Sequence, residues 1–171
     1  MTPTALIQLC RECAASIYGA RPPTPAYSES VARLLMGTAA TESHLKDRRQ
    51  RGFSNERLDG AWGLWQTEQG AVADSVLYLR RRGDVLAHAA RFVDLSTLFH
   101  MDVRERLERI RIDDRFAVLF ARLHYLRKPS SVPEDLRAQA AYYKQHYNTV
   151  AGKGSIQKYI NDWHQFIEPE L

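Results

Sequence analysis

Apolar residues recur at helical spacing along most of the chain, and this pattern limits the fold more than any other feature. The clearest example begins at Asp113-Asp114 and ends before Pro129. Its apolar residues lie three or four positions apart: Phe116, Leu119, Phe120, Leu123 and Leu126. This period places one apolar stripe along one side of a helix, whereas a half-buried strand would alternate. The chain is therefore predicted to be mainly helical.

Similar patterns predict where the other helices lie. We expect helices over residues 4–17, 28–42, 68–82, 85–92, 95–101, 103–110, 113–126, 133–147 and 156–167. Ser28-Glu29-Ser30 is expected to cap the second helix, and Pro133 to lie in the first turn of the eighth. Gly83-Asp84 is expected to stop the third helix.

The remaining features of the chain indicate one domain. Residues 45–61 are mostly polar and contain glycines, so they are expected to form a loop or a small irregular hairpin. A length of 171 residues suits one domain with its own core. The prediction is a single mainly-α domain spanning residues 1–171.

The composition argues against a membrane protein. Apolar residues make up 44% of the chain and charged residues 26%, which is typical of globular proteins. No run approaches the roughly 18 to 20 apolar residues of a transmembrane helix, so no membrane span is expected. The first ten residues lack a basic start, and Arg11-Glu12 interrupts their apolar stretch, so we expect no secretory signal peptide. Another protein would then have to deliver the chain to any substrate outside the cytoplasm.

Two basic clusters accompany the net charge of +4. The first, Lys46–Arg51, either lines a groove for an anionic polymer or is a solvated face. The second, Arg80–Arg82, is interpreted as a solvated face. Nucleic-acid binding ranks last among the functions considered, because no basic motif interleaved with aromatic residues is present.

Cysteine and histidine spacing predicts neither a metal nor a cofactor. Cys10 and Cys13 form a lone Cys-x-x-Cys inside a helical segment, without a second cysteine pair or a histidine at ligand spacing. We expect two reduced, partly buried thiols there. The six histidines are scattered, and none pairs at helical spacing with another histidine or a cysteine.

The best candidate for chemistry is Glu42. It follows a stretch of apolar and small residues, Val31–Ala40, of the kind that forms a core helix. A helix of that kind ending in Glu42-Ser43 would hold a carboxyl group at the edge of a cleft. Burial raises the pKa of a carboxyl group, and a general acid working near neutral pH needs such a raised pKa. Ser43 is expected to hydrogen-bond the carboxylate or the adjacent backbone.

A second string, Gly60–Glu68, completes the predicted cleft. Gly63 begins a turn, Gly63-Leu64-Trp65-Gln66, and would allow a sugar to approach the backbone closely. Trp62 and Trp65 are interpreted in two ways. They either present flat faces on which sugar rings stack or pack in the core, and we expect core packing for at least one of them.

Together with Tyr147-Asn148, these strings resemble a known family. Its pattern is Glu-Ser, then Gly-Leu-Met-Gln, then Ala-Tyr-Asn-x-Gly, and this chain is similar to it in residue type and order. The family is the lytic transglycosylase and goose-type lysozyme group of the lysozyme-like superfamily. The chain departs from the pattern in Trp65 for methionine, in His146 for alanine, and in Gly152, which lies two positions late.

The resemblance implies a lysozyme-like fold and cleavage of peptidoglycan at the β-1,4 bond between N-acetylmuramic acid and N-acetylglucosamine. Glu42 would be the catalytic acid and then the base, and Ser43 would orient either Glu42 or the substrate. The remaining positions would bind the glycan strand: Trp62, Gly63, Leu64, Trp65 and Gln66 on the cleft floor, and Tyr147 with Asn148 on the opposite wall.

With Gly63-Leu64-Trp65-Gln66-Thr67-Glu68 in place of the bacterial string, the chain also resembles small virion-associated proteins of tailed phages. That resemblance implies synthesis in the host cytoplasm and delivery to the periplasm by a virion or a holin. The expected partners are glycan strands and other virion proteins. The alternative function is a structural or adaptor protein of a phage tail or baseplate that keeps the lysozyme-like core without catalysis.

Two further carboxylates leave the reaction product open. A transglycosylase uses one carboxyl group and forms a 1,6-anhydro sugar. A hydrolase needs a second carboxylate, about 6.5 to 9.5 Å from the first in an inverting enzyme. Glu68 and Asp59 are the candidates, although Glu68 is also a natural acid for a helix N-terminus and Asp59-Gly60 a natural turn. These ordinary uses favour the single-carboxylate reaction.

Overall fold

The computed structural model describes residues 1–50, 58–148 and 154–171. It is mainly helical, which confirms the prediction of a mainly-α chain. The α-helices are α1 (Pro3–Ser16), α2 (Pro25–Ser43), α3 (Gln69–Arg81), α4 (Gly83–Phe92), α5 (Val103–Ile112), α6 (Asp114–Leu126), α7 (Leu136–Tyr143) and α8 (Ile156–Phe166). A π-helical turn, η1 (Lys144–Asn148), follows α7, and a 3-10 turn, η2 (Glu168–Glu170), follows α8. A two-stranded antiparallel sheet pairs β1 (Ala61–Trp62) with β2 (Thr67–Glu68).

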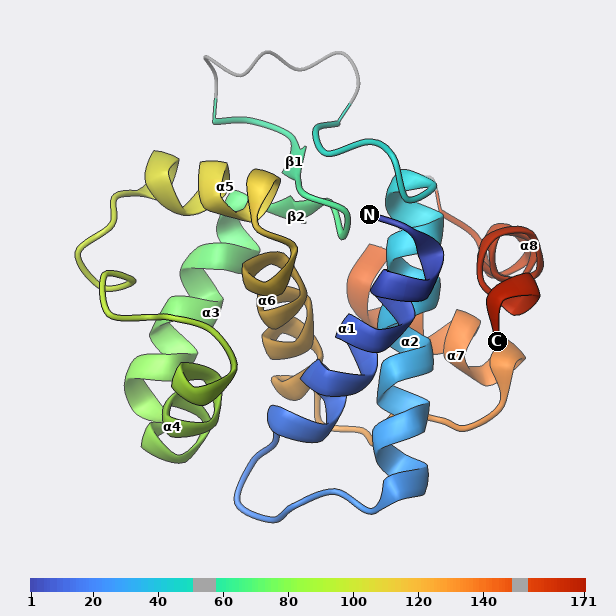
Figure 1. Ribbon diagram of the computed structural model, residues 1–171, viewed down its shortest axis with the longest axis horizontal. Helices are drawn as coiled ribbons and strands as arrows, with labels where there is room; N and C mark the ends of the chain where they lie inside the picture. The colour runs from blue at the N-terminus through green and yellow to red at the C-terminus, as the bar shows by residue number, and fades with distance from the viewer. Residues whose placement is uncertain (51–57, 149–153) are drawn as a thin grey trace.

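Helices α2 and α6 lie at the centre of the molecule (Figure 1). Nearly all of the second half of α2 is buried, as is most of α6. The two helices also share a buried polar contact, because Thr38 Oγ1 lies 2.8 Å from the Tyr125 hydroxyl. Helix α1 packs along α2, α3 and α5 pack against α6, and α4 packs against α1 and α3. The apolar stripe predicted over residues 113–126 therefore faces the core.

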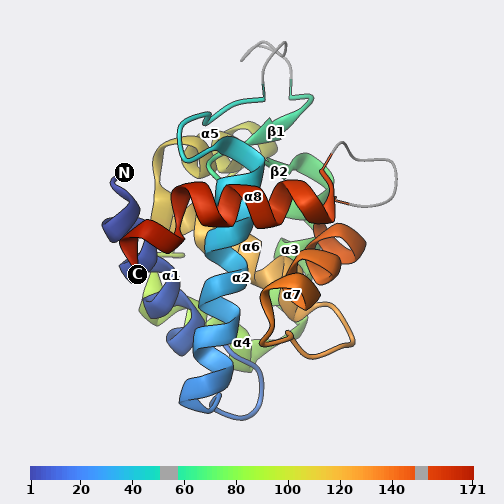
Figure 2. The ribbon, with the colours of Figure 1, turned by 90° about the vertical axis from the view of Figure 1, so that its right-hand side faces the viewer.

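Helix α8 crosses α2 at close range, as Figure 2 shows. A glycine makes this crossing possible. A Cβ atom on Gly37 would lie 2.1 Å from the hydroxyl oxygen of Tyr159, which is fully buried. The absence of a side chain at Gly37 thus fixes how near α8 lies to the last turns of α2.

Two helices begin elsewhere than predicted, because other residues cap them. Helix α2 begins at Pro25 rather than near residue 28, since Thr24 accepts a hydrogen bond from the Tyr27 amide and proline suits the first helical position. Helix α7 begins at Leu136, and the Asp135 carboxylate caps it. The prediction that Pro133 starts this helix was wrong.

The connection between α3 and α5 also differs from the prediction. Helix α3 ends at Arg81, before Gly83-Asp84 as predicted, but α4 begins directly at Gly83, two residues earlier than expected. Residues 95–101, predicted as a helix, form turns instead. The Asp94 carboxylate accepts a hydrogen bond from the Ser96 amide. The Leu98 amide donates to the Leu95 carbonyl oxygen and closes a tight turn. These local bonds replace the regular ladder of an α-helix.

The hairpin lies later in the chain than the predicted region, residues 45–61. Its turn is Gly63–Gln66, and its register pairs Ala61 with Glu68. An isolated antiparallel bridge joins Arg49 to Trp62 and ties the segment after α2 to the sheet. Residues 51–57 of the predicted region lie outside the described residues.

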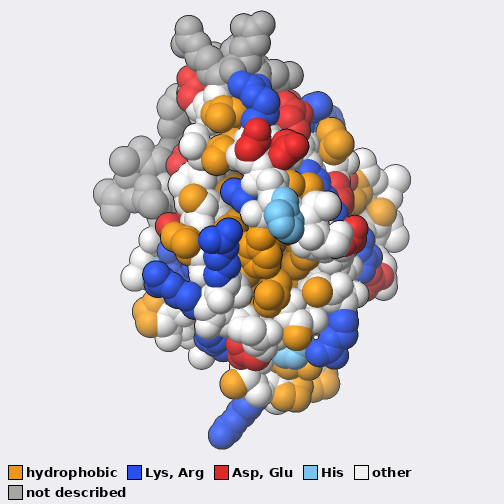
Figure 3. Space-filling view, turned by 90° about the vertical axis from the view of Figure 1, so that its left-hand side faces the viewer, with side chains coloured by type: hydrophobic (Ala, Val, Ile, Leu, Met, Phe, Trp, Pro, Cys, Tyr) orange, Lys and Arg blue, Asp and Glu red, His pale blue; other side chains and the backbone are white. Residues whose placement is uncertain are grey.

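Figure 3 shows the face over α3, α4 and α5, where hydrophobic side chains gather and lysine and arginine side chains lie around them. Two arginines of α5 form local ion pairs. Arg109 lies 3.3 Å from Asp113, and Arg111 lies 2.8 Å from Glu108. Among the described residues, no helix is both long and apolar enough to cross a membrane.

Candidate active site

A polar cavity of about 540 Å³ opens beside the C-terminal end of α2. The sheet, α6, α7 with η1, and α8 form its other walls. Its most informative lining residues are Glu42, Gln66, Thr67, Glu68, His124, Tyr143, Tyr147, Asn148 and Lys158. Residues from widely separated parts of the chain therefore meet at one site. Five of the predicted site residues are among them: Glu42, Gln66, Glu68, Tyr147 and Asn148.

Glu42 reaches this cavity because α2 ends beside it. Thr41 and Ser43 are buried, whereas Glu42 between them is partly exposed. His44 then adopts a left-handed conformation with φ of 48°, which terminates the helix. The buried helix thus holds the Glu42 carboxyl group at the boundary between the core and the cavity.

The surroundings of Glu42 hold its pKa above the usual value. Burial is the main cause, because the ionised carboxylate loses hydration. The Tyr143 hydroxyl donates a hydrogen bond of 2.6 Å to Oε1, and Asn148 Nδ2 lies 3.5 Å from the same atom. These bonds and the charge of Lys158 oppose the rise in pKa, whereas the charge of Glu68 adds to it. A raised pKa suits a group that must deliver a proton near neutral pH.

Tyr147 and Asn148 occupy the π-helical turn on the wall facing Glu42. The Tyr147 hydroxyl donates a hydrogen bond of 2.7 Å to the Trp65 carbonyl oxygen, which joins η1 to the hairpin. Lys144 Nζ donates to Asn148 Oδ1 over 3.0 Å, so the amide nitrogen of Asn148 is turned toward Glu42. The expected opposite wall of the site is therefore in contact with the candidate acid.

Gln66 holds the hairpin turn in shape at the edge of the cavity. Its backbone has a left-handed φ of 46°, and its side-chain nitrogen donates to the carbonyl oxygens of Asp47 and Gly63. Gln66 therefore fixes the turn relative to the segment after α2.

Trp62 and Trp65 are both fully buried, and neither is among the described residues that line the cavity. Of the two interpretations, core packing, which was expected for at least one ring, holds for both. Trp65 Nε1 donates a hydrogen bond of 2.9 Å to the Leu35 carbonyl oxygen, and the Arg49 guanidinium lies 4.0 Å from the centre of the Trp62 ring. Both tryptophans join the hairpin to the core.

Three other predicted residues also turn away from the cavity. Ser43 is buried, and its hydroxyl donates to the Ala39 carbonyl oxygen of its own helix rather than to Glu42. Leu64 is buried in the core. Gly63 has φ of +72°, and a Cβ there would lie 2.6 Å from the Ile110 carbonyl oxygen. Gly63 thus permits close contact with α5 rather than with a ligand.

The two candidates for a second carboxylate differ in position. Glu68 is exposed and lines the cavity together with Glu42. Although Glu68 immediately precedes α3, its carboxylate makes no capping hydrogen bond within the part of the chain that the structure describes. Asp59 is not among the described lining residues, and its carboxylate lies 3.7 Å from Arg49 Nη2. Glu68 is therefore the carboxylate available to act with Glu42.

The arginines of the first basic cluster that the structure describes, Arg48 and Arg49, contact other protein side chains. Arg48 forms an ion pair with Asp114, and Arg49 packs over Trp62. Gln50 lines the cavity. Arg51 lies outside the described residues.

The cavity residues that were not predicted from the sequence include His124, Tyr143 and Lys158. Burial lowers the pKa of His124 to about 4, so its ring is neutral near pH 7, and its Nε2 lies 2.6 Å from the His146 carbonyl oxygen. Tyr143 and Lys158 could not be distinguished in the sequence from ordinary helix residues. Only the packing of α7 and α8 brings them to Glu42.

The structure places the cysteines away from any reactive surface. Cys10 and Cys13 are free thiols and are fully buried, which is deeper than predicted. Burial raises the pKa of both. Within residues 1–50, 58–148 and 154–171, no group of three or more His, Cys, Asp or Glu side chains could hold a metal ion.

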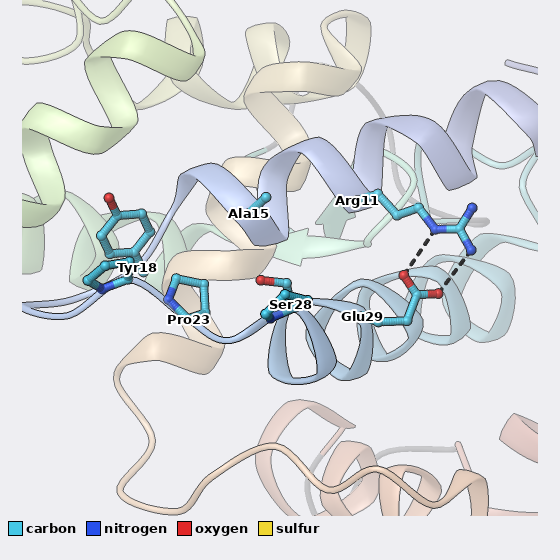
Figure 4. A pocket seen from close by; sticks show the side chains of 8 residues that line it. Arg11, Ala15, Tyr18, Pro23, Ser28 and Glu29 are labelled. Carbon is cyan, nitrogen blue, oxygen red and sulfur yellow. Dashed lines mark hydrogen bonds and ion pairs between the residues drawn. The ribbon is translucent and has the colours of Figure 1, made fainter.

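A second hollow, of about 490 Å³, lies between α1 and the start of α2 (Figure 4). Tyr18, Pro23 and Ser28 line it, and Arg11 and Glu29 form a two-bonded ion pair at one end. It shares no described residue with the cavity at Glu42.

No protein-family model, curated protein or solved structure matches this chain. Its chemistry therefore has to be argued from the geometry around Glu42.

Proposed function

We propose that this chain is a peptidoglycan-cleaving glycosidase of the lytic transglycosylase type, with a lysozyme-like fold and Glu42 as its catalytic acid. Its substrate is the β-1,4 bond between N-acetylmuramic acid and N-acetylglucosamine. The proposal depends chiefly on one observation. A carboxyl group with a raised pKa, held by Tyr143 and Asn148, lies at a polar cavity large enough for sugar rings.

The proposed reaction has two proton transfers through the same carboxyl group. Protonated Glu42 gives its proton to the glycosidic oxygen as the bond from that oxygen to C1 of the muramic acid breaks, and positive charge develops on the sugar ring. The resulting carboxylate then takes the proton from the C6 hydroxyl group, and the C6 oxygen bonds to C1. The products are a free 4-hydroxyl group and a 1,6-anhydro terminus. Tyr143 and Asn148 stabilise the carboxylate between these steps, because both donate to it.

A hydrolytic product is the second candidate, and Glu68 is the observation in its favour. Its exposed carboxylate lines the same cavity and does not cap α3 through any described contact. A carboxylate in that position can take a proton from water as the water attacks C1. The product then has a reducing end.

Clearing of a peptidoglycan suspension tests the proposed activity. The wild type is expected to reduce turbidity, and Glu42→Gln to lose at least a thousandfold of that activity, because the amide cannot deliver a proton. Glu134→Gln is a matched control, since Glu134 is exposed and is not among the described lining residues. If the folded wild type clears nothing, the alternative of a non-catalytic virion protein replaces this proposal.

A further inference from the structure

Lys158 of α8 has an unusual set of partners at the end of α2. Its Nζ donates hydrogen bonds of 2.5 Å to the Thr41 carbonyl oxygen and 2.5 Å to Asp162 Oδ2. The same nitrogen lies 3.3 Å from His44 Nε2. Lys158 also lines the cavity that contains Glu42. One ammonium group thus connects α8, the backbone beside Glu42 and the wall of the site.

The bond to Thr41 satisfies a carbonyl group in the last turn of α2. The last four carbonyl groups of a helix lack the usual partners within it, and they form the negative end of the helix dipole. Ala40 finds a partner in the His44 amide. The Thr41 carbonyl, one residue before Glu42, is instead bound by a cation, which is the favourable charge at a helix C-terminus.

The position of Lys158 is set by the tight crossing of α2 and α8. Its neighbour Tyr159 is fully buried and lies against Gly37. Any side chain at position 37 would overlap the Tyr159 ring unless that ring moved. Asp162, one turn further along α8, is itself buried and holds the other side of the ammonium group. Lys158 is therefore held between two elements rather than extended into solvent.

We propose that Lys158 is a positioning residue for Glu42, which fixes the last turn of α2 against α8 and places a positive charge on the wall of the same cavity. This inference rests on the proposed function for its effect on catalysis. Its effect on the carboxyl group itself does not require a substrate.

The charge of Lys158 acts within a defined set of neighbours. Glu68 of β2 faces Glu42 with a negative charge, and Lys158 faces it with a positive one. The Tyr143 and Tyr147 hydroxyls stay protonated, because burial raises the pKa of both. The neutral ring of His124 on α6 carries no charge near pH 7. Removal of the Lys158 charge leaves Glu68 unopposed, and the pKa of Glu42 must then rise.

The experiment compares Lys158→Gln and Lys158→Arg with the wild type. Glutamine removes the charge but keeps a donor for the Thr41 carbonyl, and arginine keeps both. Lys46→Gln is the control, because Lys46 is exposed just beyond α2 and does not line the cavity. The pKa of Glu42 is read from its ¹³C carboxyl signal, which is assigned by its loss in Glu42→Gln. The activity on peptidoglycan is measured as a function of pH.

In Lys158→Gln the pKa of Glu42 is expected to rise by about 0.5 to 1, a modest shift because Lys158 is partly exposed. The alkaline limb of the pH profile should move to higher pH by the same amount, and kcat at the optimum should fall about tenfold. Lys158→Arg should restore both, and Lys46→Gln should change neither. If Lys158→Gln does not fold, Lys158→Met, which removes the charge and keeps a side chain of similar length, takes its place.

An unchanged Glu42 pKa in a folded Lys158→Gln protein, or in Lys158→Met, would overturn the inference. So would a shift of the same size in Lys46→Gln. If the wild type does not cleave peptidoglycan, the proposed function fails while the titration still decides the role of Lys158.

Discussion

The Tyr143 hydroxyl donates a 2.6 Å hydrogen bond to the Glu42 carboxyl group from a ring that is almost wholly buried. Burial and the nearby Glu42 charge raise the pKa of Tyr143, so this hydroxyl remains a donor throughout the physiological pH range. The bond favours the ionised form of Glu42 and opposes the effect of burial. The two residues together set how readily the carboxyl group releases its proton.

Replacement of Tyr143 by phenylalanine should therefore raise the pKa of Glu42. A hydrogen bond to a charged group contributes about 1.5 to 3 kcal/mol, and a pKa change of 1 corresponds to about 1.4 kcal/mol. We expect a pKa rise of about 1 and a fall in kcat of roughly tenfold or more. The measurement is the ¹³C titration of Glu42 together with the pH profile of cleavage. Tyr142→Phe is the control, because the Tyr142 hydroxyl donates to Ser130 instead; an equal effect there would contradict the account.

The stability of Glu42→Gln should depend on pH. Burial raises the pKa of Glu42 in the folded protein above its unfolded value of about 4.3, so the folded state binds this proton more tightly. Ionisation of Glu42 therefore lowers the free energy of unfolding as pH rises above that value. Glutamine cannot ionise, and the variant should melt at the same or a higher temperature than the wild type at pH 7. Thermal unfolding at pH 7 and pH 4 should show the difference shrinking at pH 4, and a variant that unfolds at both would assign Glu42 a structural role.

The candidate acid could be predicted from the sequence, but its partners could not. An apolar helix that ends in Glu42-Ser43 was predicted to hold one carboxyl group at the edge of a cleft. In the structure, Glu42 is partly exposed and lines the cavity. Tyr143 and Lys158 belong to α7 and α8, more than a hundred residues later in the chain. No local pattern distinguishes them, because only the packing of α7 and α8 in the folded chain brings them to Glu42. Trp62 and Trp65 failed as sugar-binding candidates for the same reason, since their burial depends on how the hairpin packs.

Replacement of Trp65 by phenylalanine should lower stability rather than substrate affinity. The change removes the hydrogen bond to the Leu35 carbonyl oxygen and leaves that buried acceptor without its indole donor. We expect a loss of about 1 to 3 kcal/mol in the free energy of unfolding. Urea unfolding measures this loss, and the KM for peptidoglycan should stay within about twofold of the wild type. A large rise in KM at unchanged stability would return Trp65 to the substrate-binding surface.

Gly37→Ala tests the contact between α2 and α8. The new Cβ would overlap the Tyr159 ring and hydroxyl, and overpacking of a core costs about 1 to 3 kcal/mol. Gly70→Ala is the matched control, because no atom lies within 4 Å of the added Cβ in α3. That variant should be neutral or slightly more stable, since alanine favours helix. Equal stability of the two variants in urea unfolding would contradict the tight crossing.

Helices with strong internal signals were predicted well, and short segments were not. The stripe from Phe116 to Leu126 determines α6 almost by itself, and Asp113 caps it as its position suggested. Residues 95–101 carry apolar residues too, but Asp94 bonds the local backbone and favours turns. Thr24 rather than Ser28 caps α2, because the fixed backbone φ angle of Pro25 suits the first helical turn. Where a helix begins, and whether a short segment is helical, depends on a few local hydrogen bonds that the spacing of apolar residues does not predict.

The most direct test of the account is mass spectrometry of purified sacculi digested by the wild type and by Glu42→Gln. Fragments with 1,6-anhydro-muramic acid ends are expected from the wild type and none from the variant. Reducing ends would assign the reaction to hydrolysis, with Glu68 as the second carboxylate. Equal release of fragments by both proteins, or no release by a folded wild type, would contradict the assignment of Glu42 as the catalytic acid.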